Sequence, residues 1–340
     1  MEKSKRLIAF DILKLAMAFL VVCIHFNTFI PRDIIVPIAR IAVPVFFVAT
    51  GFFVAGAKDQ LLAKAKRLVI TAVKYLLVAM VIYFVYDLIA ALVNGTSLTL
   101  LFDKLLYENF IIDFFVYSLP NTSGYQLWYL SAFVVAALVH LLLCKLKLTK
   151  AYYLLVPLLL IANLVLGEYA SLLGIDILPA YTTRNALLTG VPFLGIGFLI
   201  KQNQLLIKDK WKYALLAAGL IFAGLQALEM HLIDPNGLSD GRVYITTIFA
   251  VVCLFVFAAS VELRSEKFYH YIDIRLCFTI YLFHVLVGRA LGAISPSIQY
   301  ALLIYVICFV VLGAACMLER YLVKKIKAKR GLEQPKEPTE

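Results

Sequence analysis

The feature that most constrains this chain is a succession of long apolar stretches that recurs from one end to the other. A helix needs about 20 mostly apolar residues to cross a bilayer, and ten stretches fit that description. They are residues 7–30, 34–56, 68–93, 126–144, 151–168, 184–200, 213–231, 242–262, 272–292 and 298–321. Because a lipid-facing backbone must satisfy its own hydrogen bonds, we predict an all-α, polytopic integral membrane helix bundle with about ten transmembrane helices.

Composition excludes the soluble alternatives. Hydrophobic residues make up 63% of the 340 residues and charged residues only 16%, whereas a soluble domain is about half apolar and about a quarter charged. An ordinary cytoplasmic enzyme, a disordered chain and a disulfide-stapled secreted module are therefore excluded. The six cysteines all lie in apolar stretches and form no C-x-x-C pair, so we predict neither a metal site nor a disulfide framework.

The net charge of the chain is +11, and its basic residues are distributed as in proteins anchored in a membrane rather than as on a nucleic-acid-binding surface. With the N-terminus inside, the outer connecting segments hold only two basic residues, Arg32 and Lys104, whereas the inner ones hold 22 of the 32 lysines and arginines. The inner segments are 1–6, 57–67, 145–150, 201–212, 263–271 and 322–340. This asymmetry predicts that both termini are cytoplasmic, with membrane lipids as partners and no nucleic acid.

Two regions fall outside the regular succession of spans. Residues 94–125 contain turn signals around an apolar and aromatic middle, which we interpret as an extracytoplasmic interfacial segment; a further pair of short spans is the alternative. Residues 323–340 form a basic and charged cytoplasmic tail. We therefore divide the chain into a transmembrane domain, 1–322, and this tail.

The first span carries the richest set of polar side chains: Asp11, Lys14 and His25. Ionisable groups within a span are costly, so each is a candidate functional residue. Lys14 and His25 are eleven residues apart, which places them on one helix face and roughly 16 Å apart along the axis. Histidine can exchange a proton near neutral pH. The alternatives are a His25 hydrogen-bonded to a neighbouring helix and a Lys14 paired with Asp11.

Other polar residues extend this pattern. Lys64, Lys66 and Arg67 follow the second span and match a phosphate ligand, although their spacing alone favours membrane anchoring, because the other inner segments are also basic. His284 lies in the ninth span, where a bundle could bring it to His25. Arg40 and Arg184 are among the further charges in or near spans, and this inventory indicates a polar-lined cavity.

Several of these residues belong to motifs found together in one family. In chain order the motifs are FDILKLAMAFLVVCIHF, with Lys14 and His25; AVPVFFVATGFF, residues 42–53; Lys64-x-x-Arg67; LWYL, with Trp128; and YLFH, ending at His284. The chain resembles the acyltransferase 3 family of membrane-bound O-acyltransferases over most of its length. It departs from the family pattern at Lys14 and Lys64, where arginine is commoner, and at Thr50, where serine is.

The resemblance implies an acyl-CoA-dependent O-acetyltransferase of the plasma or inner membrane. Such an enzyme moves an acyl group, often acetyl, from cytoplasmic acyl-CoA to a hydroxyl of a cell-envelope carbohydrate or lipid-linked glycan. Acetyl-CoA or another acyl-CoA is then the donor, and no metal is needed. By analogy His25 and Lys14 are catalytic, Lys64, Lys66 and Arg67 contact the CoA phosphates, and Asp11, Trp128 and His284 are further candidates.

Two other functions stay open on the residues alone. A transporter or exporter of a small molecule such as serine, or of a glycan precursor, would also need charges within the membrane. A non-catalytic scaffold in a glycan assembly machine would not need His25. The discriminating property is CoA binding, because a transporter has no use for phosphate-binding cations at Lys64, Lys66 and Arg67.

Overall fold

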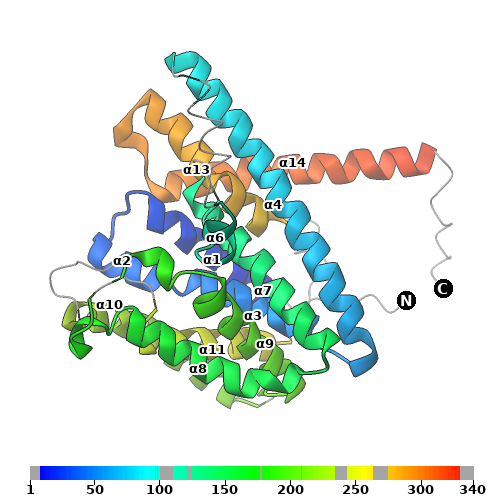
Figure 1. Cartoon of the computed structure of the whole chain (residues 1–340). Helices are drawn as coiled ribbons and strands as arrows, with labels where there is room; N and C mark the ends of the chain where they lie inside the picture. Colours follow the sequence, from blue (N-terminus) through cyan, green and yellow to red (C-terminus); the bar gives the residue numbers. More distant parts are fainter. Residues whose placement is uncertain are drawn as a thin grey trace.

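The computed structural model describes residues 8–95, 97, 99, 110–120, 124–176, 178–207, 209–233, 243–262 and 275–329. All regular elements in these ranges are helices, and the only extended pairing among them is a single bridge between Asn27 and Tyr300. The all-α prediction is therefore confirmed for this part of the chain. The helices form one bundle, from which the last helix extends (Figure 1).

The predicted spans coincide with helices. The longer ones are α1 (Ile8–His25), α2 (Arg32–Ala39), α3 (Ala42–Val54), α4 (Lys58–Asn94), α7 (Trp128–Lys145), α8 (Tyr152–Leu166), α9 (Val191–Gln202), α10 (Trp211–Ile233), α11 (Ile245–Ser260), α13 (Leu276–Ile294) and α14 (Ala301–Lys329). Among the described residues, eight helical segments, with α2 and α3 taken as one, are long and apolar enough to cross a membrane. The segments Ala186–Gln202 and Ile245–Ser260 are shorter, so the count of ten spans stays a prediction, as does the placement of both termini in the cytoplasm.

The surface of the bundle is that of a protein in lipid. Within the most apolar window of α4 only 22% of residues are buried, and its outward side chains include Leu77, Val81 and Leu92, each more than half exposed. In water such a continuous apolar surface would drive aggregation, whereas in a bilayer it contacts hydrocarbon. The chain is a multi-pass membrane protein.

Successive helices run back and forth, so their termini gather at two ends of the bundle. At one end the bridge between Asn27 and Tyr300 joins the end of α1 to the start of α14. At the opposite end the Tyr153 hydroxyl donates to Asn203 Oδ1 at 2.7 Å, which ties the start of α8 to the end of α9. We call the first the His25 end, because α1 finishes there with His25.

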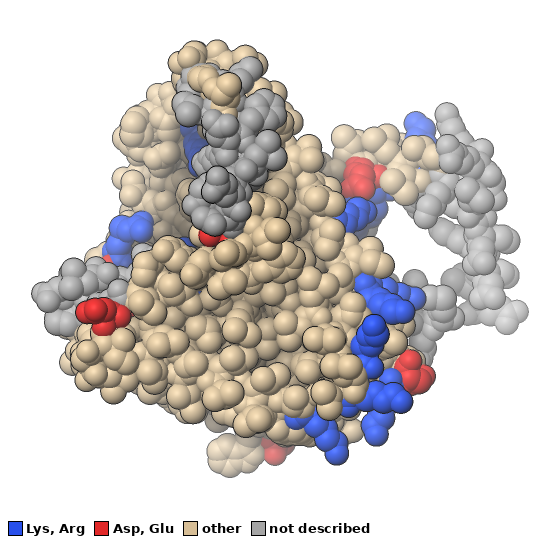
Figure 2. All heavy atoms as spheres, in the orientation of Figure 1, with Lys and Arg blue, Asp and Glu red and all other residues tan. Residues whose placement is uncertain are grey.

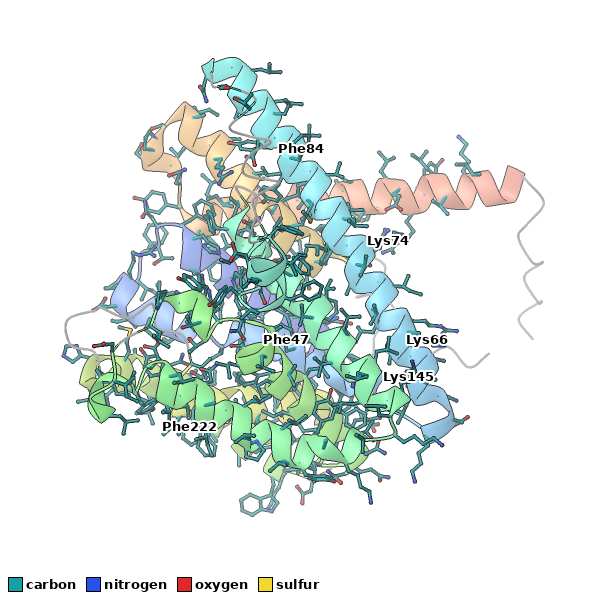
Figure 3. All side chains as sticks on the ribbon, viewed as in Figure 1. Phe47, Lys66, Lys74, Phe84, Lys145 and Phe222 are labelled. Atoms are coloured by element: carbon teal, nitrogen blue, oxygen red, sulfur yellow. The ribbon has the colours of Figure 1, made fainter. Side chains whose placement is uncertain are left out.

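The opposite end carries many of the lysines and arginines, and we call it the basic end. Its cations include Lys58, Lys64, Lys66, Arg67, Lys145, Lys147, Lys150 and Lys201. Figure 2 shows Lys and Arg side chains gathered along one side of the surface, and Figure 3 places Lys66 and Lys145 in that region. Because α4 and α7 pack together and run in opposite directions, the start of one lies beside the end of the other.

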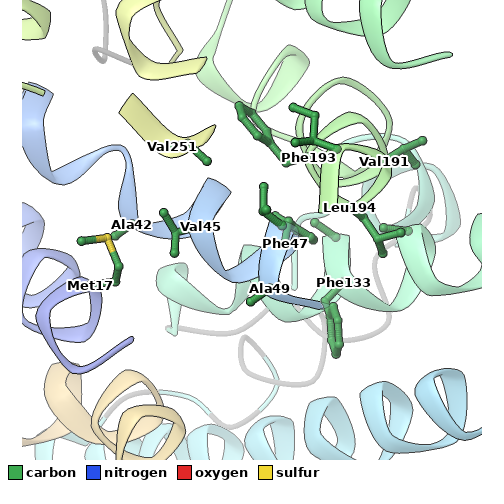
Figure 4. Packing of buried hydrophobic residues seen from close by; sticks show 14 of the residues in the cluster. Met17, Ala42, Val45, Phe47, Ala49, Phe133, Val191, Phe193, Leu194 and Val251 are labelled. Atoms are coloured by element: carbon green, nitrogen blue, oxygen red, sulfur yellow. The ribbon is translucent and has the colours of Figure 1, made fainter. Parts of the chain in front are cut away.

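Helix α3 lies at the centre of the core, packed between α1, α9 and α11. Its closest partner is α9, and two glycines permit the approach. A Cβ on Gly51 would lie 1.8 Å from the Leu194 carbonyl oxygen, and one on Gly197 would lie 1.8 Å from that of Val48. Small residues of this kind let helix backbones pack tightly in membranes. Figure 4 shows Phe47 of α3 beside the α9 side chains.

Some helix boundaries differ from the predicted spans. The segment 57–67 is mostly helical, because α4 starts at Lys58, ten residues before the predicted span. The span predicted at 34–56 is divided at Arg40 and Ile41 into α2 and α3. Helix α14 continues to Lys329, into the predicted tail. Of the predicted interfacial segment, the helix α6 (Phe110–Phe115) packs on α7, whereas most of 96–109 and all of 121–123 and 330–340 lie outside the described residues.

Candidate active site at the His25 end

His25 is the last residue of α1, and its imidazole is stacked on that of His284 from α13. The two ring centroids are 5.4 Å apart with an interplanar angle of 25°. On another side the His25 ring meets the edge of Tyr125, with centroids 4.9 Å apart. The bundle therefore brings together the two histidines, which lie 259 positions apart in the sequence.

The hydrogen bonds of His284 define its tautomer. His284 is fully buried, and its Nδ1 lies 2.7 Å from the Tyr281 carbonyl oxygen and 3.0 Å from that of Ile280. Carbonyl oxygens only accept hydrogen bonds, so Nδ1 carries the proton and donates. Nε2 is then an acceptor, and among the described residues it has no hydrogen-bond partner.

A pocket opens beside His25, with about 680 Å³ of empty volume including its mouth. Its walls come from α1, the α2–α3 junction, the turn η1 (Tyr125–Leu127) with the start of α7, the segment before α9, the residues before α11, and α13. They consist of Val21, Ile24, His25, Arg40, Val43, Pro44, Tyr125, Gln126, Trp128, Tyr129, Arg184, Thr189, Val243 and Tyr281. The wall is aromatic and apolar with a few polar groups, as expected for a small-molecule site.

Two arginines give the pocket wall its charge. Arg40 and Arg184 both line it, and no Asp or Glu is among the described residues that line it. The Arg184 guanidinium lies over the Trp128 ring, 5.2 Å from its centroid, which combines cation–π attraction with packing. Among the described residues, the charged groups that line this space with His25 are therefore guanidinium groups.

Irregular backbone places both arginines. Arg40 sits at the break between α2 and α3, where its N–H still donates to the Pro37 carbonyl at 3.0 Å. Arg184 precedes the π-helical turn η5 (Ala186–Gly190), whose start is capped by the Asn185 side chain accepting from Leu188 N–H at 2.9 Å. Asn163 of α8 donates to the Leu188 carbonyl at 2.8 Å. Irregular backbone inside a membrane protein is tolerated where it is buried or lines a cavity.

A buried hydrogen-bond network holds the pocket floor. The Tyr83 hydroxyl of α4 donates to the Leu282 carbonyl at 2.9 Å and accepts from Gln126 Nε2. The Tyr281 hydroxyl donates to the Gln126 carbonyl at 2.6 Å. Three elements, α4, the turn η1 (Tyr125–Leu127) and α13, are thereby joined next to His25.

Lys14 lies away from this pocket. Its Nζ is 2.5 Å from Asp11 Oδ1 and 5.0 Å from the centroid of Phe10, and Lys14 is absent from the pocket lining. The alternative in which Lys14 pairs with Asp11 is thus present in the structure. The two residues lie in the half of α1 nearer the basic end, about three turns from His25.

The three predicted donor cations lie at the start of α4, at the basic end. Lys64 is half-buried and its Nζ donates to the Ala55 carbonyl at 2.9 Å, just after α3 ends. Lys66 and Arg67 are exposed. Lys64 therefore satisfies a carbonyl at a helix terminus, while its two neighbours face outward.

The family to which the chain belongs follows from comparison with known protein families. A family model described as an acyltransferase domain matches residues 7–320, nearly the whole chain. The chain belongs to the acyltransferase 3 family. Comparisons with curated proteins and with solved structures gave no match. The resemblance found in the motifs is confirmed, and the protein is a membrane acyltransferase.

In this acyltransferase, two of the candidates predicted from the sequence, His25 and Trp128, line the pocket. A third, His284, stacks on His25 but does not itself line the pocket. The motifs did not identify Tyr125 and Gln126, which line the pocket, or Tyr83, which hydrogen-bonds to Gln126. A single polar or aromatic residue within or beside an apolar stretch carries no distinguishing pattern. Arg40 and Arg184 were visible as charges near spans, although nothing in the sequence places them together. No group of three or more His, Cys, Asp or Glu suited to a metal occurs among the residues that the structure describes.

Proposed function

We propose that the protein is an acyl-CoA-dependent O-acyltransferase of the plasma membrane that acylates, most simply acetylates, a hydroxyl of an extracytoplasmic cell-envelope glycan. The observation that carries the proposal is the placement of His25 on the wall of a pocket at one end of the bundle, opposite the basic end. A cytoplasmic nucleotide donor and an external acceptor require two such ends.

In the proposed reaction the His25 imidazole acts as general base. It accepts the proton of the acceptor hydroxyl as that oxygen attacks the thioester carbonyl carbon. The new C–O bond forms, the C–S bond breaks, and the CoA thiolate leaves and takes up a proton. His284 does not touch the substrate in this scheme; it is a positioning residue whose ring holds that of His25.

The donor half of the proposal rests on the basic end. Lys66 and Arg67 are exposed there, so their cationic groups are available to CoA phosphates. Lys64 contributes less directly, because its Nζ already donates to Ala55. The thioester must then reach His25 along the direction of α1, past the Lys14–Asp11 pair. The pantetheine arm of CoA is long and thin enough for such a path.

The test measures release of free CoA from acetyl-CoA by the full chain in nanodiscs, with a panel of envelope sugars. His25→Ala should reduce kcat by about a hundredfold or more, within the range of general-base contributions. His231→Ala is the matched control, because His231 is an exposed histidine at the end of α10. Its activity should equal that of the wild type.

Donor binding is tested separately by calorimetry with CoA. Lys66→Ala/Arg67→Ala should weaken CoA binding, whereas Lys147→Ala/Lys150→Ala, which removes two cations elsewhere at the basic end, should not. Absence of both CoA binding and CoA release in the wild type would contradict the donor assignment and favour a transporter. Binding without release would instead mean that the acceptor is missing from the sugar panel.

A further inference from the structure

The pocket beside His25 is positively charged on the acceptor side of the proposed reaction. Its charged wall residues are Arg40 and Arg184, and no carboxylate of the part of the chain that the structure describes lines it. Both side chains are half-buried, so their guanidinium groups are only partly solvated. A neutral sugar would need neither charge, and placing two cations in a membrane-embedded wall is costly.

The chemistry of the arginines selects the ligand. The guanidinium group is planar and offers paired N–H donors that match the oxygens of a phosphate or a carboxylate. The Arg184 guanidinium is held in place over Trp128, and the helix break places the backbone of Arg40 at the pocket wall. A guanidinium held in this way loses little freedom on binding, which favours recognition of an anionic group at one position.

The rest of the wall fits the neutral body of the same ligand. Tyr125, Trp128, Tyr129 and Tyr281 supply aromatic surface, and His25 is on the wall beside them. A molecule with its anionic group at the arginines would place a neighbouring hydroxyl within the space that His25 faces.

We propose that Arg40 and Arg184 bind an anionic group, a phosphate or a carboxylate, on the acceptor, and that the acceptor is therefore an acidic glycan or a phosphate-linked one. This inference rests on the proposed function. It names the class of acceptor that His25 deprotonates, and excludes a wholly neutral sugar as the preferred substrate.

The experiment measures binding of small probes to the full chain in nanodiscs of neutral lipid. The probes are glycerol 3-phosphate, methyl glucuronide and the uncharged methyl glucoside, observed by calorimetry or ligand-observed NMR. The anionic probes should bind more tightly than methyl glucoside. Arg40→Gln and Arg184→Gln should each weaken the Kd for an anionic probe by about tenfold to a hundredfold, the effect of losing one charge-assisted hydrogen bond.

Two further variants make the result specific. Arg184→Lys keeps the charge but loses the paired donors, so its affinity should fall between those of the wild type and Arg184→Gln. Arg32→Gln is the nearby control: Arg32 lies at the same end and donates to the Ile24 carbonyl at 3.2 Å, but it does not line the pocket. Its Kd should stay within about threefold of the wild type. Anionic lipid added to the nanodiscs should compete with glycerol 3-phosphate if the natural phosphate belongs to a lipid-linked acceptor, and should not if it belongs to a soluble one.

Several outcomes would overturn the inference. They are equal affinity for charged and uncharged probes, no binding of any anionic probe, and an unchanged Kd in both glutamine variants. A lowered kcat with unchanged probe binding would assign the arginines to the reacting oxyanion instead. Loss of CoA affinity in the same variants would assign them to the donor. Intact probe binding without any acetyl-CoA turnover would contradict the proposed donor while supporting the anionic site.

Discussion

At the scale of single residues, the contact between His25 and His284 is the one on which the proposed chemistry most depends. The rings are stacked, and no hydrogen bond links them in the described structure. His284 therefore acts on His25 through packing, and its buried Nε2 contributes little to holding the base. A base displaced by about 1 Å can lose a hundredfold in rate.

This predicts different effects for two substitutions of His284. His284→Phe keeps a planar ring against His25 and should retain activity within about tenfold of the wild type. His284→Ala removes the ring and should lower kcat by about a hundredfold. CoA release measured on both variants in nanodiscs checks this, with thermal unfolding to verify folding. If His284→Phe were as inactive as His284→Ala, the Nε2 acceptor rather than the stack would be required.

Tyr83 is the residue on which the floor of the pocket depends. Its hydroxyl joins Leu282 and Gln126 in a fully buried position. Tyr83→Phe would leave the Gln126 side-chain amide without its acceptor, and should destabilise the fold by about 1–3 kcal/mol. Thermal unfolding in nanodiscs measures the loss. Tyr75→Phe on the same helix is the control, because Tyr75 is exposed and its hydroxyl has no hydrogen bond among the described residues. A loss of stability equal to that of Tyr83→Phe would contradict the role given to the Tyr83 hydroxyl.

At the scale of helices, the α3–α9 contact depends on two glycines. A Cβ on Gly51 or Gly197 would lie 1.8 Å from a carbonyl oxygen of the facing helix, and backbone cannot yield as a flexible side chain can. Gly51→Ala and Gly197→Ala should each cost about 3 kcal/mol or more, measured as lost thermal stability or lost folded yield. Gly224→Ala in α10 is the matched control. Nothing lies within 4 Å of its Cβ position, so alanine should be neutral or stabilise by up to about 1 kcal/mol. A well-folded, stable Gly51→Ala protein would contradict the close packing.

The end of α3 is held by a hydrogen bond from Lys64 at the start of α4. Because Lys64 Nζ donates to the Ala55 carbonyl, Lys64→Met should lower stability by about 0.5–1.5 kcal/mol. Lys66→Met, on the exposed face of the same helix, should change stability by less than about 0.5 kcal/mol. The same substitution should weaken the binding of CoA. Parallel unfolding and CoA titrations separate the two effects. Equal stability for the two variants would show that the Lys64 hydrogen bond contributes nothing.

At the scale of the whole molecule, we predict that the two ends of the bundle are accessible from opposite sides of the membrane. The basic end should face the cytoplasm and the His25 end the outside, as the distribution of lysine and arginine indicates. Leu172→Cys, in the exposed turn η3 (Ser171–Leu173), should react with a membrane-impermeant maleimide in intact cells. Lys66→Cys should react only after permeabilisation. The reverse pattern would invert the topology and, with it, the sides assigned to donor and acceptor.

The sequence by itself determined that this protein is a bundle of membrane helices, because a run of apolar residues in lipid can satisfy its backbone only as a helix. It also identified His25, Trp128 and His284 through ordered motifs. These properties are local, since they depend on composition and on spacing within one segment. The start of α4 at Lys58 escaped the prediction because a polar helix outside the hydrocarbon leaves no apolar run.

Only the tertiary structure decided which polar residues meet. His25 and His284 are far apart in the chain, and Arg40 and Arg184 are placed by a helix break and a π-helical turn that no periodicity marks. Lys14 shares a helix with His25 but pairs with Asp11, away from the pocket. Contacts between helices depend on how closely the helices approach and cross. In α3 and α9, Gly51 and Gly197 permit the close approach. The charge of the pocket is thus a property of the assembled bundle rather than of any one span.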